Sequence, residues 1–132
     1  MSNPPATPPA LRSTRTLIAT GAVLGASAVM LGAFAAHALS GRLSPQQAGW
    51  WQTAVHYQMW HALAVLLVAV LPVPRARLVG TLFAAGTLIF SGTLYAMALG
   101  APRWLGAVTP LGGLALIGGW LLLGWSALRA AP

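Results

Sequence analysis

The sequence predicts an all-α integral membrane protein, a single domain of four transmembrane helices that form a bundle running up, down, up and down. Two observations predict this fold class. Of the 132 residues, 58% are apolar and only 5% are charged, whereas roughly a quarter of the residues in a soluble domain are charged. In addition, four apolar runs long enough to cross a bilayer are separated by short segments that contain proline and arginine.

The charged residues exclude several kinds of chemistry. The chain has no Asp, Glu or Cys, and all seven basic residues are arginines. Carboxylate pairs, Schiff-base lysines, thiolate nucleophiles and disulfides are therefore excluded. The arginines flank the apolar runs, where they would face lipid phosphates rather than form a patch for nucleic acid. We therefore expect membrane lipid as a partner, no nucleic acid, no cofactor and no metal.

The first predicted helix covers residues 15–38 and follows a disordered, proline-rich tail at residues 1–14. Its uncharged run from Leu17 to Ala36 is about 30 Å long as a helix, which matches the hydrocarbon core. A cleaved signal peptide is the alternative, but the run is longer than the ~7–15 apolar residues of such peptides. Small residues along one face predict close packing against another helix. These are Gly21, Gly25 and Gly32, together with Ala28 and Ala35.

The second predicted helix covers residues 45–71. Ser44 is the expected N-cap, Pro45 the first helical residue and Gln47 the N3 partner of a capping box. Pro72 and Pro74 end the helix because proline lacks the backbone N–H that a helix interior needs.

The third predicted helix covers residues 76–99, and Gly92 starts a ridge of small residues on it. The fourth covers residues 104–128 and contains Pro110. Either this helix is long and bent at Pro110, or an interfacial segment precedes a helix that starts there. The long, bent helix is favoured. Gly112 and Gly113 are its expected packing residues.

The arginines also predict topology. With four spans, one side of the membrane holds Arg12, Arg15, Arg75, Arg77 and Arg129, and the other side holds Arg42 and Arg103. Cytoplasmic segments carry the excess of positive charge. Both termini are therefore predicted to be cytoplasmic.

Polar side chains within the spans are the candidate functional residues, because unsatisfied polar groups cost several kcal/mol in hydrocarbon. Most lie on the second helix, and the set consists of His37, Gln52, His56, Gln58, His61, Ser91 and Tyr95.

The spacing of these residues suggests particular partners. His56 and His61 point roughly 140° apart on one helix and cannot share a metal. Ser91 and Tyr95 are candidate partners for His61, while His37 is placed nearer Gln52, His56 or the loop. A role in interhelical hydrogen bonds is favoured over a pathway for a small molecule, lipid or ion.

Four motifs resemble a small bacterial membrane family, domain of unknown function 423, to which the animal transmembrane protein 256 is similar. They are Gly32-Ala-Phe-Ala-Ala-His37, Trp51-Gln-Thr-Ala-Val-His-Tyr-Gln-Met-Trp-His61, Phe90-Ser-Gly-Thr-Leu-Tyr95 and Thr109-Pro-Leu-Gly-Gly113. Ala35 stands where the family pattern has glycine, and His56 stands at a variable position. The resemblance implies a four-helix protein of the bacterial inner membrane and no established activity.

The sequence leaves three classes of function. A non-enzymatic membrane component that packs with itself or with a partner protein is favoured. The alternative is a small oligomeric transporter or channel with a polar pathway lined by His, Gln and Tyr. An enzyme acting on lipid or quinone is disfavoured, because no nucleophile, base and orienting group can be assembled from these residues. We therefore predict no catalytic residue.

Overall fold

The computed structural model describes residues 9–129, and these residues confirm the predicted all-α membrane architecture. The helices are α1 (Pro9–His37), α2 (Pro45–Val70), α3 (Ala76–Ala98) and α4 (Thr109–Arg129), with a short 3₁₀ helix, η1 (Arg103–Ala107), before the last. Four segments are each long and apolar enough to cross a membrane. No strand occurs within residues 9–129.

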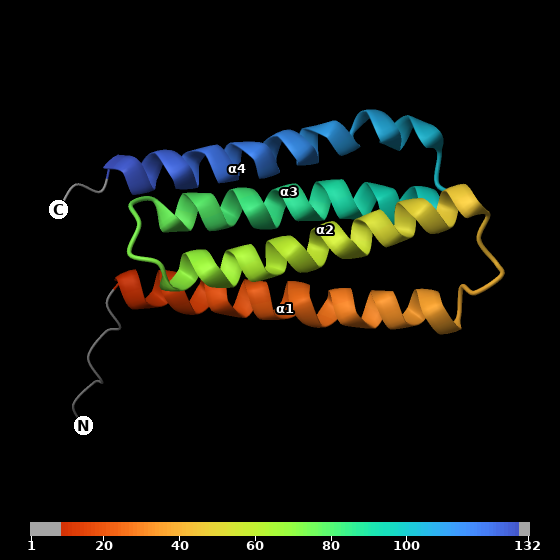
Figure 1. The fold of residues 1–132 in the computed structure, drawn as a ribbon, viewed down its shortest axis with the longest axis horizontal. Coiled ribbons are helices and arrows are strands. Elements are labelled where there is room, and N and C mark those ends of the chain that lie inside the picture. Colours follow the sequence, from red (N-terminus) through yellow and green to blue (C-terminus); the bar gives the residue numbers. More distant parts are fainter. Residues whose placement is uncertain (1–8, 130–132) are drawn as a thin grey trace, which may run out of the picture.

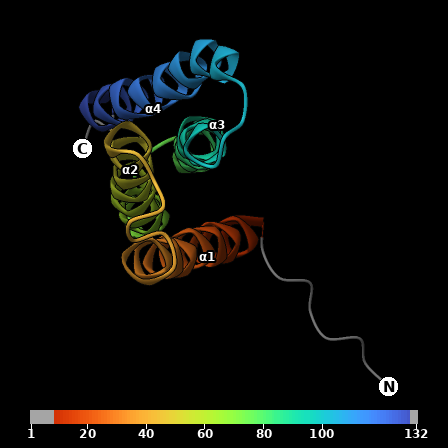
Figure 2. The same ribbon diagram turned by 90° about the vertical axis from the view of Figure 1, so that its right-hand side faces the viewer.

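The four helices form an open, antiparallel bundle (Figure 1). The helices α2 and α3 pack side by side in the centre, while α1 packs mainly on α2, and α4 packs mainly on α3. The end-on view shows α1 and α4 on opposite sides of the central pair (Figure 2). The start of α1, the start of α3 and the end of α4 therefore share one end of the bundle, as Figure 1 shows.

The helix boundaries differ from the expected ones in two places. Residues 9–14, expected in the disordered tail, belong to α1, whereas residues 1–8 lie outside the described part. The last helix is also not one continuous helix from residue 104, because the 3₁₀ helix η1 precedes α4. Pro110 has no N–H and its ring would clash with the carbonyl one turn earlier in a helix interior, so proline favours the first turn of a helix, where α4 has it. Of the two interpretations, the structure therefore agrees with a separate short segment followed by a helix that starts near Pro110.

The start of α2 follows its local sequence closely. The Ser44 backbone N–H donates to Gln47 Oε1 at 3.0 Å, and the Gln47 backbone N–H donates to Ser44 Oγ at 3.2 Å. Pro45 is at the first helical position. This capping box fixes where α2 begins, and thereby the height of each polar side chain along it.

The apolar core lies where α2 and α3 meet the outer helices. Phe83 and Val79 of α3 are fully buried with Val65 of α2, and Leu17 of α1 and Leu116 of α4 pack against them. Many large apolar side chains face outward instead, such as Val23 and Leu121. Outward apolar side chains suit a protein whose surroundings are lipid.

Glycines allow the closest helix crossings. A Cβ on Gly21 would lie 2.7 Å from the Leu66 side chain, and one on Gly112 would lie 2.8 Å from the Gly86 carbonyl oxygen. A Cβ on Gly25, Gly32 or Gly113 would only make ordinary contacts, with Ala62, Val55 and Phe90 respectively.

Gly92 differs from the expectation, because no heavy atom lies within 4 Å of a Cβ built there. The close-packed glycines of α3 are Gly80 and Gly86, which face α1 and α4. Gly92 is exposed on α3 and therefore does not provide the close helix contact predicted for it.

Candidate functional site

Gln58 of α2 joins three helices in the middle of the bundle. Its side chain is only 5% exposed. Its amide Nε2 donates to the Leu24 carbonyl oxygen of α1 at 3.0 Å and to Ser27 Oγ of α1 at 2.7 Å. Its Oε1 accepts from the Tyr95 hydroxyl of α3 at 2.9 Å. Both amide hydrogens and the oxygen are therefore used within the chain.

Two further hydrogen bonds connect α2 to α1 and α3, nearer the start of α2 than Gln58. Trp51 Nε1 donates to the Leu31 carbonyl oxygen of α1 at 3.0 Å, and Ser91 Oγ of α3 donates to the Ala54 carbonyl oxygen at 2.8 Å. Trp51, Ala54 and Ser91 are all buried. The rings of Tyr95 and Trp51 also pack in an edge-to-face pair, with centroids 4.7 Å apart. The side-chain donors of Trp51, Gln58 and Ser91 are therefore all used, whereas the buried Thr87 hydroxyl of α3 has no hydrogen-bond partner within residues 9–129.

His61 links α2 to α4. Trp120 Nε1 lies 3.1 Å from His61 Nε2, and His61 Nδ1 lies 2.8 Å from the Tyr57 carbonyl oxygen. An indole N–H can only donate and a carbonyl oxygen can only accept. The partners therefore assign a neutral imidazole with its proton on Nδ1 and with Nε2 as the acceptor.

These contacts differ from the predicted partners of His61. Ser91 and Tyr95 of α3 lie beside the part of α2 that precedes His61. They therefore bond to Ala54 and Gln58 instead. Trp120 of α4 is the actual partner. Its only signal in the sequence is an indole in the middle of an apolar run, where a buried N–H needs an acceptor.

The remaining predicted residues are not in the interior. His37, Gln52 and His56 are exposed, and within residues 9–129 none of their side chains makes a hydrogen bond. The His56 ring stacks on Trp60 with centroids 5.7 Å apart and planes 24° apart. The expected closeness of His37 to the other two is not reflected in any contact.

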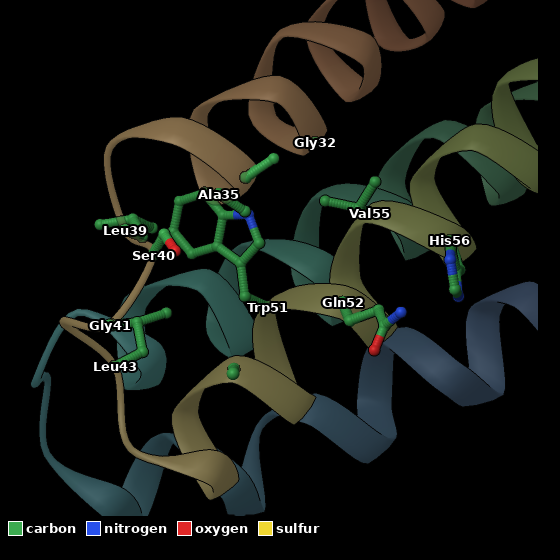
Figure 3. Close-up of a pocket in the computed structure, with 12 residues that line it drawn as sticks. Gly32, Ala35, Leu39, Ser40, Gly41, Leu43, Trp51, Gln52, Val55 and His56 are labelled. Atoms are coloured by element: carbon green, nitrogen blue, oxygen red, sulfur yellow. The ribbon is translucent and has the colours of Figure 1, made fainter.

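Gln52 and His56 line a groove of about 450 Å³ between the end of α1, the following loop and α2. Trp51 and Gly32 also line it. Figure 3 shows the Trp51 indole pointing toward α1, while Gln52 and His56 lie farther along α2. The groove is open and mainly apolar, and the polar side chains in its lining are Ser40, Gln52 and His56.

The described residues do not form a metal site. No group of three or more His, Cys, Asp or Glu side chains lies together within residues 9–129. His61 is buried and His56 is exposed on another face of α2. The arrangement can therefore hold helices together and can present hydrogen-bonding groups outward. It does not bring together groups for acid–base or nucleophilic catalysis.

Comparison with known proteins fits this arrangement. The profile of a family described as protein of unknown function DUF423 matches residues 31–113. A UPF0382 membrane protein of Staphylococcus haemolyticus is 42% identical over 57 residues, which are 43% of this chain and 47% of that protein. A UPF0382 membrane protein of Staphylococcus aureus is 40% identical over the same shares. The chain spans about half the length of these curated relatives. No solved structure gives a significant match.

Four apolar spans joined by interhelical hydrogen bonds define a small multi-pass membrane protein. The family profile covers more than half of the 132 residues. The chain belongs to the DUF423 family, whose members have no assigned function. The profile includes the end of α1, all of α2 and α3 and the start of α4, and thus every polar candidate residue.

Proposed function

We propose that this chain is a non-enzymatic component of the bacterial inner membrane that pairs with a second copy of itself. The pairing surface is the outward face of α2, defined here as Gln52, Thr53, His56, Trp60 and Leu63. All five side chains are exposed.

The observation that carries this proposal is the position of His56. It lies about 16 Å along the helix from Pro45, which places it near the middle of α2. Its ring nitrogens have no hydrogen-bond partner within residues 9–129, and neither does the nearby Gln52 amide. In lipid each such group costs several kcal/mol unless another protein surface satisfies it. A second polypeptide over this face would remove that cost.

The chemistry of this face favours a second copy as that polypeptide. Gln carries both donors and an acceptor, and a neutral His carries one of each. Across a two-fold axis each Gln52 and His56 can therefore pair with the same groups of the other copy. The face holds no arginine, so two copies would not repel each other there.

A polar pathway through one chain has little support. Gln58, Ser91, Tyr95 and His61 each bond to another helix. A transported solute would have to break these bonds. A transporter would therefore need its polar lining between copies, where Gln52 and His56 are the available groups. We do not favour a transporter. The described residues also assemble no nucleophile–base pair, so an enzymatic role has no support.

The proposed orientation places both termini in the cytoplasm. The end of the bundle where α1 and α3 begin holds Arg15, Arg75, Arg77 and Arg129, and the opposite end holds Arg42 and Arg103. Arginine-rich ends stay on the cytoplasmic side during insertion. Because the chain has no cysteine, an impermeant maleimide should label a Ser40→Cys variant in intact cells. It should label a Val73→Cys variant only in broken cells.

Single-cysteine cross-linking in native membranes tests the pairing. Trp60→Cys and Leu63→Cys place a thiol on the outward face of α2, where the native side chains are 56% and 57% exposed. Leu121→Cys, at a position 70% exposed on α4, is the matched control. We expect mild oxidation to give disulfide-linked dimers from one or both α2 variants and monomers from the control.

Adding His56→Ala to the cross-linking variants should weaken pairing by about 1 kcal/mol, or about fivefold in the dimerisation constant. Equal cross-linking from α2 and α4, or monomers from every variant, would contradict the proposal.

A further inference from the structure

Two arginines face a small pocket at the arginine-rich end of the bundle. The pocket has a volume of about 270 Å³, and its lining comes from the loop before α3 and the last turn of α4. The lining residues are Pro74, Arg75, Trp125, Ser126 and Arg129.

The guanidinium groups at this pocket have no side-chain counterion. The sequence contains no Asp or Glu, so no side chain can form an ion pair with Arg75 or Arg129. Within residues 9–129 neither guanidinium has a hydrogen bond, and Arg129 stacks on a ring, with its Cζ 4.3 Å from the centroid of Trp125. This stacking holds the charge beside the pocket while its N–H donors stay available.

The pocket lies beside the start of α3, because Pro74 and Arg75 of its lining directly precede that helix. Arg75 is the N-cap, with φ 61° and ψ 21°, and its side chain makes no capping hydrogen bond. The start of α2, in contrast, is capped by Ser44. The first backbone N–H groups of an uncapped helix are unsatisfied, and the helix dipole favours an anion beside them.

Ser126 points independently to a ligand. Its side chain is 2% exposed, and its Oγ has no hydrogen-bond partner within residues 9–129. A serine hydroxyl within a helix commonly donates to the carbonyl oxygen one turn earlier, which Ser126 does not do here. A buried hydroxyl in the wall of an arginine-lined pocket needs an acceptor, and a phosphate oxygen supplies one.

We propose that this pocket binds the phosphate group of an anionic membrane phospholipid. Arg75 and Arg129 would neutralise the phosphate, and Ser126 would donate to one of its oxygens. The pocket lies at the ends of two apolar spans, beside a half-exposed Trp125 ring of the kind found at headgroup depth. A lipid phosphate is therefore favoured over free phosphate, which has the same binding chemistry.

Lipid titration of the purified full-length protein tests this site. The thermal unfolding midpoint in detergent would be followed while phosphatidylglycerol, phosphatidylcholine or inorganic phosphate is added. A tag after the C-terminus keeps the terminal carboxylate away from Arg129. We expect stabilisation that saturates with phosphatidylglycerol and is absent with the other two probes.

Three variants and one matched control locate the bound lipid. Arg75→Gln and Arg129→Gln should each lower the apparent affinity for phosphatidylglycerol about fivefold to tenfold, because each removes a charged donor. Ser126→Ala should lower it about threefold. Arg77→Gln is the control, since Arg77 is in the same helix turn but lines a separate groove between α1 and α3. It should change the affinity less than about twofold, as expected for a screened surface charge.

Several results would overturn the proposal. Equal stabilisation by phosphatidylcholine would show that the phosphate charge is not recognised. Saturation by inorganic phosphate alone would assign the pocket to a free anion. Equal losses in Arg77→Gln and Arg75→Gln would show that only the general charge of this end matters. Far-UV circular dichroism of each variant separates these results from a loss of fold.

Discussion

Gly112→Ala should destabilise the protein by about 3 kcal/mol, the expected cost of overpacking a rigid contact. The added methyl group would lie against the Phe90 backbone nitrogen and 2.8 Å from the Gly86 carbonyl oxygen. Both neighbours are main-chain atoms of α3, so neither can move without moving the helix. The helices α3 and α4 would separate, and Leu116 would lose part of its packing against Phe83.

Gly118→Ala provides the matched control for this prediction, because it is the same substitution on the same helix. No heavy atom lies within 4 Å of a Cβ built at Gly118. Alanine is the better helix former by about 1 kcal/mol, so this variant should be neutral or slightly more stable. Reversible unfolding in mixed micelles, followed by tryptophan fluorescence, measures both. Similar stabilities for the two variants would show that α3 and α4 do not cross closely at Gly112.

Gln58→Leu should destabilise the protein by about 2 kcal/mol. The change leaves the Leu24 carbonyl, the Ser27 hydroxyl and the Tyr95 hydroxyl without their present partner. Interhelical hydrogen bonds in membranes are worth ~0.6 kcal/mol each on average, and three bonds are lost together. The same unfolding measurement gives the free energy.

Gln52→Leu makes the same chemical change at an exposed position of α2 that has no hydrogen bond within residues 9–129. In monomeric protein it should change stability by less than about 0.5 kcal/mol. A double-mutant cycle that combines Gln58→Leu with Tyr95→Phe isolates the hydrogen bond between these two side chains. If Gln58→Leu were no more harmful than Gln52→Leu, the three-helix junction would not contribute to stability.

The sequence signals that predicted structure correctly are local ones. The four spans follow from the length of apolar runs, and the start of α2 follows from Ser44, Pro45 and Gln47, because a capping box depends on residues three positions apart. Gly21, which packs closely, lies on the predicted face of small residues on α1. That prediction is also local, since it depends only on small residues at helical spacing. The similarity to the animal transmembrane protein 256 stays a prediction.

Features that depend on how helices meet could not be read from the sequence. Gly86 and Gly92 are both small residues on α3, and only the crossing with α4 decides that Gly86 packs closely and Gly92 does not. The partner of His61 is likewise set by the height of α4 relative to α2, which brings Trp120 to its Nε2. One-dimensional spacing could exclude a His56–His61 pair, but it could not find an acceptor–donor pair 59 residues apart.

The central claim is that the buried polar side chains hold the helices together, and His61 tests it most directly. The measurement is the imidazole ¹⁵N NMR spectrum of the lipid-reconstituted protein, recorded across pH with and without zinc. The account predicts that His61 stays neutral with its proton on Nδ1 under all these conditions, and that Trp120→Phe removes this fixed tautomer. A His61 signal that titrates near neutral pH, or that shifts with zinc in the native sequence, would contradict the claim and would indicate a water-accessible site.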